Sequence, residues 1–341
     1  MPRKGNVAFL IGVAGVVTLL LLLVVSGVAQ AQYQAEVDKA IDTLNLKQQE
    51  PEPGVGVGVY TWDTPYDEFI GVDDFQLRVG HDLEYVLWFQ AMGDHDANFQ
   101  EHAVNEAVLR GLVPIISLEP WLRNFDERSN PQPEYSFQRV AAGNFDGYFR
   151  LWARRAAESA APMYVRFGQD PSVLGAAHWY PWQDDTPENY IGAFRRMVGI
   201  FREEGATNVK FIWSSNNLGV ESQWDYYPGD EYVDAIATTT LNFGSWGTWQ
   251  SFAELFDPQY AEIRERAEDM PIFIIQLASA EDGGDKAVWL TTTFNQIETS
   301  YEGIQAVIFW EVPSDWQYAD LNWAVNSSPA AATAAVESLA P

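Results

Sequence analysis

The chain has 341 residues, with 20 Lys and Arg against 48 Asp and Glu, which gives a formal net charge of −28. So acidic a chain repels phosphate backbones and anionic lipid headgroups, which excludes nucleic acid as a natural partner. A neutral polysaccharide or oligosaccharide is indifferent to this charge. Cysteine is absent, so disulfides, thiolate catalysis and cysteine-ligated metals are excluded, and the four histidines have no metal-ligand spacing, so we predict no metal site.

The N-terminus has the features of an export segment. Arg3 and Lys4 precede an apolar run from 7 to about 29, which ends in an Ala-Gln-Ala sequence at 29–31. The run also reaches the ~20 residues needed to span a bilayer. Two outcomes therefore stay open for residues 1–31: cleavage as a signal peptide, or retention as a single-pass membrane anchor with the positive end inside. Both predict an extracytoplasmic location.

Residues 32–54 are predicted to be a spacer, because weak helical periodicity is broken by Glu-Pro-Glu-Pro-Gly at 50–54. From residue 55, short runs rich in Val, Ile and aromatic residues alternate with helical patterns. The predicted strands are 55–60, 84–92, 112–118, 163–168, 209–214, 232–242, 272–277 and 304–310. The predicted helices are 99–110, 145–160, 190–204 and 286–298. Residues 326–341, rich in Ala and Ser, are predicted to be a flexible tail.

Eight short strands, mostly separated by helices, predict an α/β fold with a parallel sheet. Their number and the length of about 270 residues favour one closed (β/α)8 TIM barrel over 55–325. No glycine-rich nucleotide-binding fingerprint follows any strand, so we predict no cofactor.

The C-terminal ends of barrel strands are where such folds place their binding and catalytic groups. Aromatic side chains follow most of these ends, and flat rings with amides and hydroxyls between them suit sugar rings. The alternative is that these aromatic residues only cap the barrel core. The predicted substrate-binding residues are Trp62, Trp121, His178, Trp179, Tyr180, Trp182, Trp213, Asn216, Trp246 and Trp310.

A series of motifs resembles glycoside hydrolase family 26, the β-mannanase family. The stretch Arg166-Phe-Gly-Gln169-Asp170, followed by His-Trp-Tyr-Pro-Trp at 178–182, is similar to the family's acid strand, in which Arg-x-His-Glu-Met-Asn-Gly leads into Trp-Tyr-Pro-Trp. The strand at 271–276 and the Gly-Gly-Asp-Lys segment after it resemble the nucleophile strand and its helix. The resemblance covers about residues 55–325 and implies a barrel with a sugar-binding cleft.

The departures from the family pattern fall on the chemistry. The resemblance places a general acid at Gln169 and a nucleophile at Gln276, and both are glutamines. It also places a histidine at Gly168 and a supporting tyrosine at Leu241. Retaining glycosidases need two carboxyl groups ~5–5.5 Å apart. We therefore predict a catalytically impaired pseudo-glycosidase that binds a neutral β-linked polysaccharide such as a mannan or a glucan.

Two other hypotheses stay open. An active glycoside hydrolase could use relocated carboxylates, with Asp170, Glu119 and Glu311 as candidates, because an inverting pair needs ~6.5–9.5 Å between its carboxyls. Against it, Asp170 could cap a loop and the two glutamates could be hydrogen-bonded rim residues. The other hypothesis is a membrane-tethered scaffold subunit without a glycan ligand. The sequence does not specify an oligomeric state.

Overall fold

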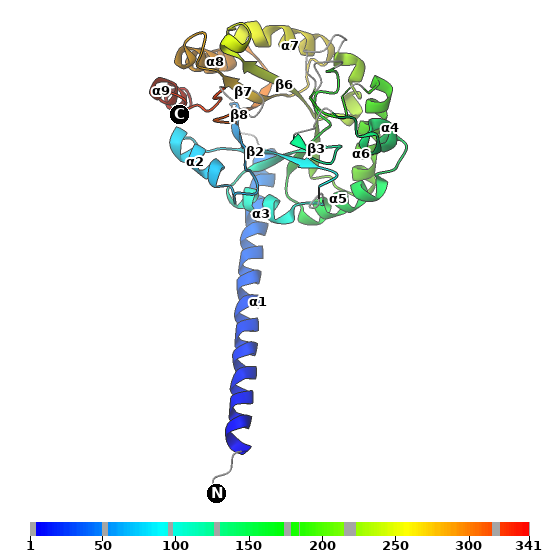
Figure 1. Cartoon of the computed structure of the whole chain (residues 1–341), viewed down its shortest axis with the longest axis vertical. Helices are drawn as coiled ribbons and strands as arrows, with labels where there is room; N and C mark the ends of the chain where they lie inside the picture. Colours follow the sequence, from blue (N-terminus) through cyan, green and yellow to red (C-terminus); the bar gives the residue numbers. More distant parts are fainter. Residues whose placement is uncertain are drawn as a thin grey trace.

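The computed structural model describes residues 5–49, 54–94, 98–125, 130–173, 179–183, 185–214, 223–315 and 321–340, with side chains described from residue 26 onward. Eight parallel strands form a closed barrel in chain order, which confirms the predicted (β/α)8 fold (Figure 1). The strands are β1 Gly56–Thr61, β2 Tyr85–Ala91, β3 Val113–Glu119, β4 Met163–Phe167, β5 Val209–Ser214, β6 Ala235–Asn242, β7 Ile272–Ser279 and β8 Ile304–Glu311.

Helices surround the strands as a ring (Figure 1). They are α2 Ile70–Val79, α3 Glu101–Leu109, α4 Phe137–Ala141, α5 Asp146–Ser159, α6 Pro187–Glu203, α7 Phe252–Arg266, α8 Lys286–Ser300 and α9 Pro329–Ser338. Short 3-10 turns lie in the loops: η2 Pro133–Tyr135, η4 Gln223–Tyr226, η5 Asp230–Tyr232 and η6 Gly244–Trp246. Within the described residues, the connection from β5 to β6 contains η4 and η5 and no α-helix.

Four of these helices, α2, α4, α7 and α9, were not predicted. The sequence contains a signal for α7, because Ser251 and Glu254 form a capping box at its start, but Pro258 inside the helix obscures the periodic pattern. Helix α2 begins after Phe69, which has a positive φ of 65°, and ends at Gly80 in the same left-handed region. The start of α2 therefore lacks the common polar N-cap, and only the glycine at its end is a usual helix signal.

The barrel closes by pairing of β1 with β8, and a glycine on β1 leaves the space that this pairing needs. A Cβ atom on Gly58 of β1 would lie 2.6 Å from the Ile308 side chain on β8 and 2.7 Å from Tyr85 Cβ on β2. Inside the barrel, the rings of Tyr85, Tyr164 and Phe273 pack with centroids 5.0 to 6.3 Å apart. The interior is therefore a packed core, and a ligand can enter only from an end.

Both terminal segments are more ordered than expected. Helix α1, Gly5–Gln49, includes most of the predicted spacer, and Val37, Ile41 and Leu44 are buried against the barrel. The expectation of a flexible tail over 326–341 needs correction, because α9 buries Ala331 and Ala335 completely. The small alanine side chains let α9 pack closely on α8 and α2.

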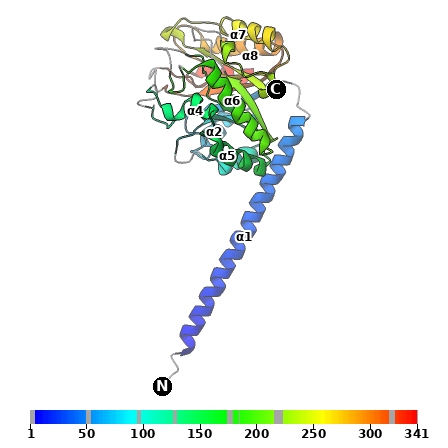
Figure 2. The same cartoon turned by 90° about the vertical axis from the view of Figure 1, so that its right-hand side faces the viewer.

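Helix α1 projects far from the barrel in two perpendicular views (Figures 1 and 2). Across the part of the chain that the structure describes, no helix is both long enough and apolar enough to cross a membrane. The export or anchor segment predicted for 1–31 lies largely outside the residues whose side chains are described.

Candidate functional site

A cavity of about 240 Å³ opens at the C-terminal ends of β8, β1, β2 and β3. Most of its wall is aromatic, and its polar groups come from four residues. The aromatic residues are Tyr60, Trp62, Tyr66, Phe89, Phe125, Tyr180 and Trp310, and the polar ones are Asp63, Thr64, Glu119 and Arg123. A concave site with many rings and few polar groups is typical of ligand pockets.

Three adjacent strands build a rigid aromatic wall. Tyr60 on β1 and Trp310 on β8 are register partners, and their rings stack at 4.2 Å with an angle of 17°. Phe89 on β2 meets both rings edge-on, at 5.1 and 6.0 Å. Because all three side chains come from strands, this wall is preformed.

The mouth of the cavity displays large rings to solvent. Trp62 is 41% exposed, Phe125 is 45% exposed, and their ring centroids lie 5.9 Å apart. Tyr66 is 58% exposed beside them. Grouped exposed aromatic residues at a cavity indicate a binding function more than a structural one.

Glu119 supplies the cavity with a buried carboxylate. Gln169 Nε2 donates to its Oε1 at 2.6 Å, and Trp121 Nε1 donates to its Oε2 at 3.0 Å. Arg123 Nη2 lies 4.0 Å from Oε2. Burial raises the pKa of Glu119, and the nearby arginine and the two donors oppose that rise. The side chain is therefore held in one orientation by neutral donors rather than by a close ion pair.

Two arginines surround this carboxylate. Arg123 is held by Asp94 at 3.4 Å and donates to the Phe89 carbonyl at 3.0 Å. Arg166 on β4 is buried behind Phe89, with its guanidinium 5.5 Å from that ring. Burial lowers the pKa of Arg166, and the charges of Asp170 and Glu119 partly restore it. The carboxylate of Glu119 thus lies between two arginine side chains, Arg123 and Arg166, at the base of the cavity.

Gln169 lies two residues beyond the end of β4 and is buried. Its amide nitrogen is committed to Glu119, and its main-chain oxygen accepts a hydrogen bond from Trp182 Nε1 at 3.0 Å. The preceding Gly168 has a φ of 52°, and a Cβ atom there would lie 2.6 Å from the Phe137 ring. Position 168 therefore requires glycine in this backbone.

Gln276 lies within β7 rather than at its end, since the strand continues to Ser279. Its Oε1 accepts a hydrogen bond from Thr239 Oγ1 at 2.9 Å. The pairing of β6 with β7 shifts register beside it, between Thr238 and Thr239. Gln276 is half-buried, and neither glutamine belongs to the residues that line the cavity.

The other two candidate carboxylates have different environments. Asp170 is buried with a φ of 54°, and its Oδ1 lies 3.5 Å from Ser214 Oγ. Burial raises its pKa, while Arg166 opposes that rise. Its main-chain oxygen accepts a hydrogen bond from Gln183 Nε2 at 2.9 Å. Asp170 therefore both organises the loop after β4 and remains a buried acid beside the cavity floor.

Glu311 needs correction as a candidate catalytic group. It follows Trp310 on β8, and because successive side chains point to opposite faces of a strand, it points away from the cavity. Arg78 on α2 donates to it at 2.6 Å and the main-chain N–H of Val325 at 2.9 Å. Burial raises its pKa. Glu311 thus joins β8 to the outer helices and is a hydrogen-bonded structural residue.

The predicted substrate-binding residues divide into three groups. Trp62, Tyr180 and Trp310 line the cavity. The others lie elsewhere: Trp121, Trp182 and Trp213 are buried, Trp179 is half-buried, and Trp246 on η6 is 53% exposed but outside the cavity lining. His178 and Asn216 lie outside the described residues.

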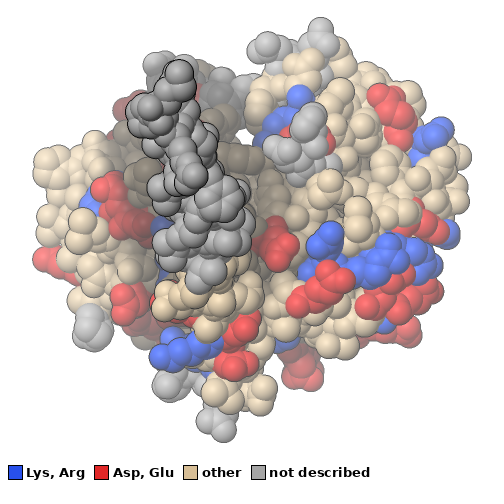
Figure 3. All heavy atoms as spheres, turned by 90° about the horizontal axis from the view of Figure 1, so that it is seen from below, with Lys and Arg blue, Asp and Glu red and all other residues tan. Residues whose placement is uncertain are grey.

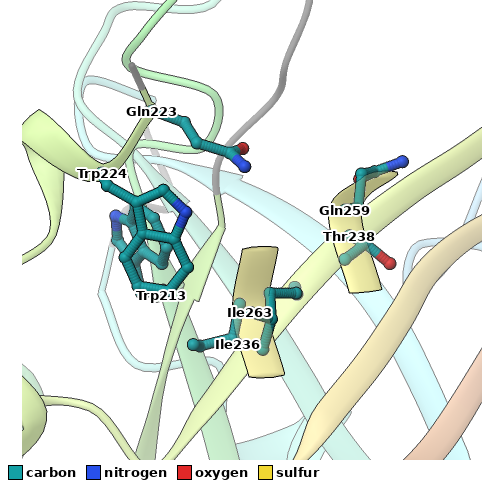
Figure 4. A pocket seen from close by; sticks show the side chains of 8 residues that line it. Trp213, Gln223, Trp224, Ile236, Thr238, Gln259 and Ile263 are labelled. Carbon is teal, nitrogen blue, oxygen red and sulfur yellow. The ribbon is translucent and has the colours of Figure 1, made fainter. Parts of the chain in front are cut away.

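Trp213 shows why a strand-end tryptophan can be structural. Its side chain lies behind the barrel wall, between β5, β6 and α7, and packs on Trp224 with ring centroids 5.2 Å apart (Figure 4). Gln223 closes the same gap and donates to Glu262 on α7 at 2.9 Å. These side chains fill the space between β5, β6 and α7, where the described part of the β5–β6 connection contains no α-helix.

Several cavity residues were missed by the sequence reasoning. Tyr60 stands at a predicted strand end, and Phe89 shares the face of its strand that points inward, so strand alternation could have found both. Asp63, Thr64, Tyr66, Arg123 and Phe125 lie in loops. No periodic pattern marks a loop residue, so their place in the wall depends on the tertiary fold.

An eight-stranded parallel barrel with an aromatic cavity at the C-terminal ends of its strands has its cavity where TIM-barrel enzymes place their active sites. The model of the family described as glycosyl hydrolase family 26 matches residues 153–270. Over these residues the chain is similar to that family.

Comparison with known proteins found a similar curated sequence. Endoglucanase H of Acetivibrio thermocellus is 34% identical over 242 residues, which are 67% of this chain and 24% of that protein. The chain thus spans about a quarter of the length of this relative.

Among solved structures, a GH26 β-mannanase from Bacteroides ovatus has a TM-score of 0.61 at 17% identity, covering 89% of this chain and 92% of that one. A double mutant of the Cellulomonas fimi endo-β-1,4-mannanase has a TM-score of 0.62 at 16% identity, covering 90% and 74%. At these identities the likeness establishes the fold.

Proposed function

We propose that this chain binds a neutral β-linked polysaccharide in the cavity at the ends of β8, β1, β2 and β3, and does not perform ordinary retaining hydrolysis. The observation that carries the proposal is the Gln169–Glu119 hydrogen bond of 2.6 Å. It fixes a glutamine against the carboxylate of the cavity, at the position where the family resemblance implies a general acid.

The aromatic wall supports the binding half of this proposal. The Tyr60, Phe89 and Trp310 rings form a preformed apolar surface for the C–H face of a sugar ring, and Trp62 and Phe125 extend it towards solvent. Glu119 and Asp63 offer acceptors for sugar hydroxyls at the edge of that surface. A glucan is the first candidate ligand, because the relative at 34% identity is an endoglucanase. A mannan is the second, from the names of the structural neighbours.

The amides at 169 and 276 support the loss of retaining hydrolysis. A double displacement needs a nucleophile that forms a covalent intermediate and an acid that protonates the leaving group. A glutamine side chain does neither near neutral pH. Gln276 accepts a hydrogen bond from Thr239, and Gln169 donates one to Glu119. Both amides therefore act as neutral hydrogen-bonding groups in the proposed function.

A second candidate function rests on Asp170 and Glu119. Both carboxyls are buried near the ends of adjacent strands, and burial raises the pKa of each. A raised pKa is what a general acid requires. An inverting hydrolase could use such a pair without a covalent intermediate. Under this hypothesis the two glutamines only position the acid and the substrate.

The test uses the full chain with β-glucans, mannans and xylans. We expect binding to at least one polymer, no release of reducing ends by the unmodified chain, and weaker binding when Trp310 is changed to alanine. Changing Trp246 to alanine is the matched control, because Trp246 is exposed outside the cavity. Absence of binding to every polymer would refute the proposal and favour the scaffold hypothesis.

Hydrolysis is then measured in three further variants. If the unmodified chain releases reducing ends and Asp170→Asn or Glu119→Gln abolishes that release, the second candidate function holds and the pseudoenzyme proposal fails. If the unmodified chain is inactive, Gln169→Glu combined with Gln276→Glu tests whether the scaffold retains the geometry for hydrolysis.

A further inference from the structure

We propose that α1 is one rigid stalk that anchors the chain in a lipid bilayer and holds the barrel close to the membrane, with α5 on the side nearest the lipid. This proposal is independent of the glycan function. It concerns a connection within one helix, between a part that meets lipid and a part that is packed on the barrel.

Charge divides α1 into two parts. Residues 5–35 contain no Asp, Glu, Lys or Arg. All the charged residues of the helix lie in its C-terminal part, at Glu36, Asp38, Lys39, Asp42 and Lys47. The uncharged part includes the apolar run at 7–29. Only that part could enter hydrocarbon, because a charge at the bilayer centre costs ~2.5–3.5 kcal/mol or more.

Contact with the barrel begins at almost the same residue. The side chains of residues 26–32 are exposed, and the first contact is the Tyr33 hydroxyl, which donates to Glu106 on α3 at 3.2 Å. Val37, Ile41 and Leu44 then recur on one helical face and are buried. The end of the uncharged part and the start of the docked part therefore coincide, and both lie within one continuous helix.

The lengths fit a membrane without a linker. At ~1.5 Å per residue, the run at 7–29 is about 34 Å long, against ~30 Å for the hydrocarbon core. From the end of that run to Tyr33 the helix rises only about 6 Å. A barrel whose first contact is at Tyr33 would therefore lie at the level of the lipid headgroups.

Helix α1 leaves the barrel at an angle. In Figure 1 the helices form a ring around the strands, and α1 runs outward past α2 and α3. The C-terminal part of α1 lies beside the end of the barrel at which the strands begin, where Asn45 Nδ2 donates to the Ala160 carbonyl ahead of β4 at 3.4 Å. Figure 2 shows that the helix then passes α5 obliquely. If α1 crosses the bilayer, α5 lies on the side of the barrel nearest the membrane.

The face towards the anchor suits this position. Seen from the side on which α1 projects, basic side chains lie beside acidic ones (Figure 3). Helix α5 on that side carries Arg150, Arg154 and Arg155, and Arg150 pairs with Glu203 and Glu204 at 2.7 Å. Pairing acids with arginines reduces repulsion from anionic headgroups, which the overall charge of −28 would otherwise produce.

Single cysteines can test this arrangement, because the chain contains none. Arg155→Cys places a label on α5 and Glu265→Cys places one on α7, on opposite sides of the barrel in Figures 1 and 2. Each full-length variant is reconstituted in vesicles whose headgroups carry a fluorescence quencher. We expect the label at 155 to lose most of its fluorescence and the label at 265 to keep most of it.

A matched pair of insertions isolates the rigid connection. A linker of about ten Gly and Ser residues between Gln32 and Tyr33 should make the two labels alike, because the barrel then tumbles freely. The same linker after Gln49 should leave the difference intact, since the docked contacts precede it. Equal quenching of the two labels in the unmodified chain, or an exported chain that begins after Ala31, would overturn the proposal.

Discussion

The ends of β3 and β8 each carry a buried glutamate, and the two serve different purposes. Glu119 is 3% exposed and lies in the cavity, where an amide and an indole N–H bind it. Glu311 is 7% exposed and faces the outer helices, where Arg78 and a main-chain N–H bind it. Burial raises both pKa values. Burial alone therefore does not identify a functional carboxylate. The two glutamates differ in the face of the strand on which the side chain lies.

The largest effect is expected where a charge pair is broken. Glu311→Gln removes the ion pair with Arg78 and weakens the contact with Val325, so we expect a loss of about 2–3 kcal/mol in the free energy of unfolding. Urea unfolding measures it. Asp74→Asn is the control: it removes the exposed partner of Arg78 and should cost less than about 1 kcal/mol. Equal losses would show that Glu311 is not the structural partner described above.

The next effect concerns the cavity. Trp310→Ala removes the ring that stacks on Tyr60, and we expect about 10–100-fold weaker binding of the polysaccharide that the chain binds best. Calorimetric titration with oligosaccharides measures it, and circular dichroism checks the fold. Unchanged affinity would place the ligand elsewhere.

A further effect is the pH dependence that Glu119 gives to stability. The pKa of Glu119 is higher in the folded chain than its ordinary value near 4.5, so the folded state holds a proton that the unfolded state has lost. Its contribution to stability therefore falls as the pH rises from about 4.5 through the folded pKa. Glu119→Gln has no such titration, and we expect the variant to become more stable relative to the unmodified chain as the pH rises through that range. Thermal unfolding at several pH values would contradict this if the difference stayed constant.

A second pH-dependent effect lies near Glu311. Lys286 is buried and donates to the carbonyls of Trp323 and Ala324, and burial lowers its pKa to about 8. Between that value and ~10.4 the unfolded state binds the proton more readily, so this group makes stability rise with pH. We expect Lys286→Met to lack that rise. Identical slopes for the two proteins above pH 8 would contradict the assignment.

Local patterns predicted much of the barrel. All eight strands were found because their Val, Ile and aromatic runs are short and bounded by turns, as in the run at 163–168. Helix α9 was missed because an Ala-rich segment has no polar face, and its burial depends on α8 and α2. For the site, the strand ends indicated the end of the barrel at which the cavity opens, but Trp121, Trp182 and Trp213 are buried.

The sequence by itself determined the strand order, the excess of acidic side chains, and the glutamines at 169 and 276, because these depend only on residue types and their spacing. Only the tertiary structure decided that Gln169 meets Glu119, residues 50 apart in sequence, and that Glu311 points away from the cavity. Contacts between distant segments depend on strand register and on which face each side chain occupies, and a shift of one residue reverses that face.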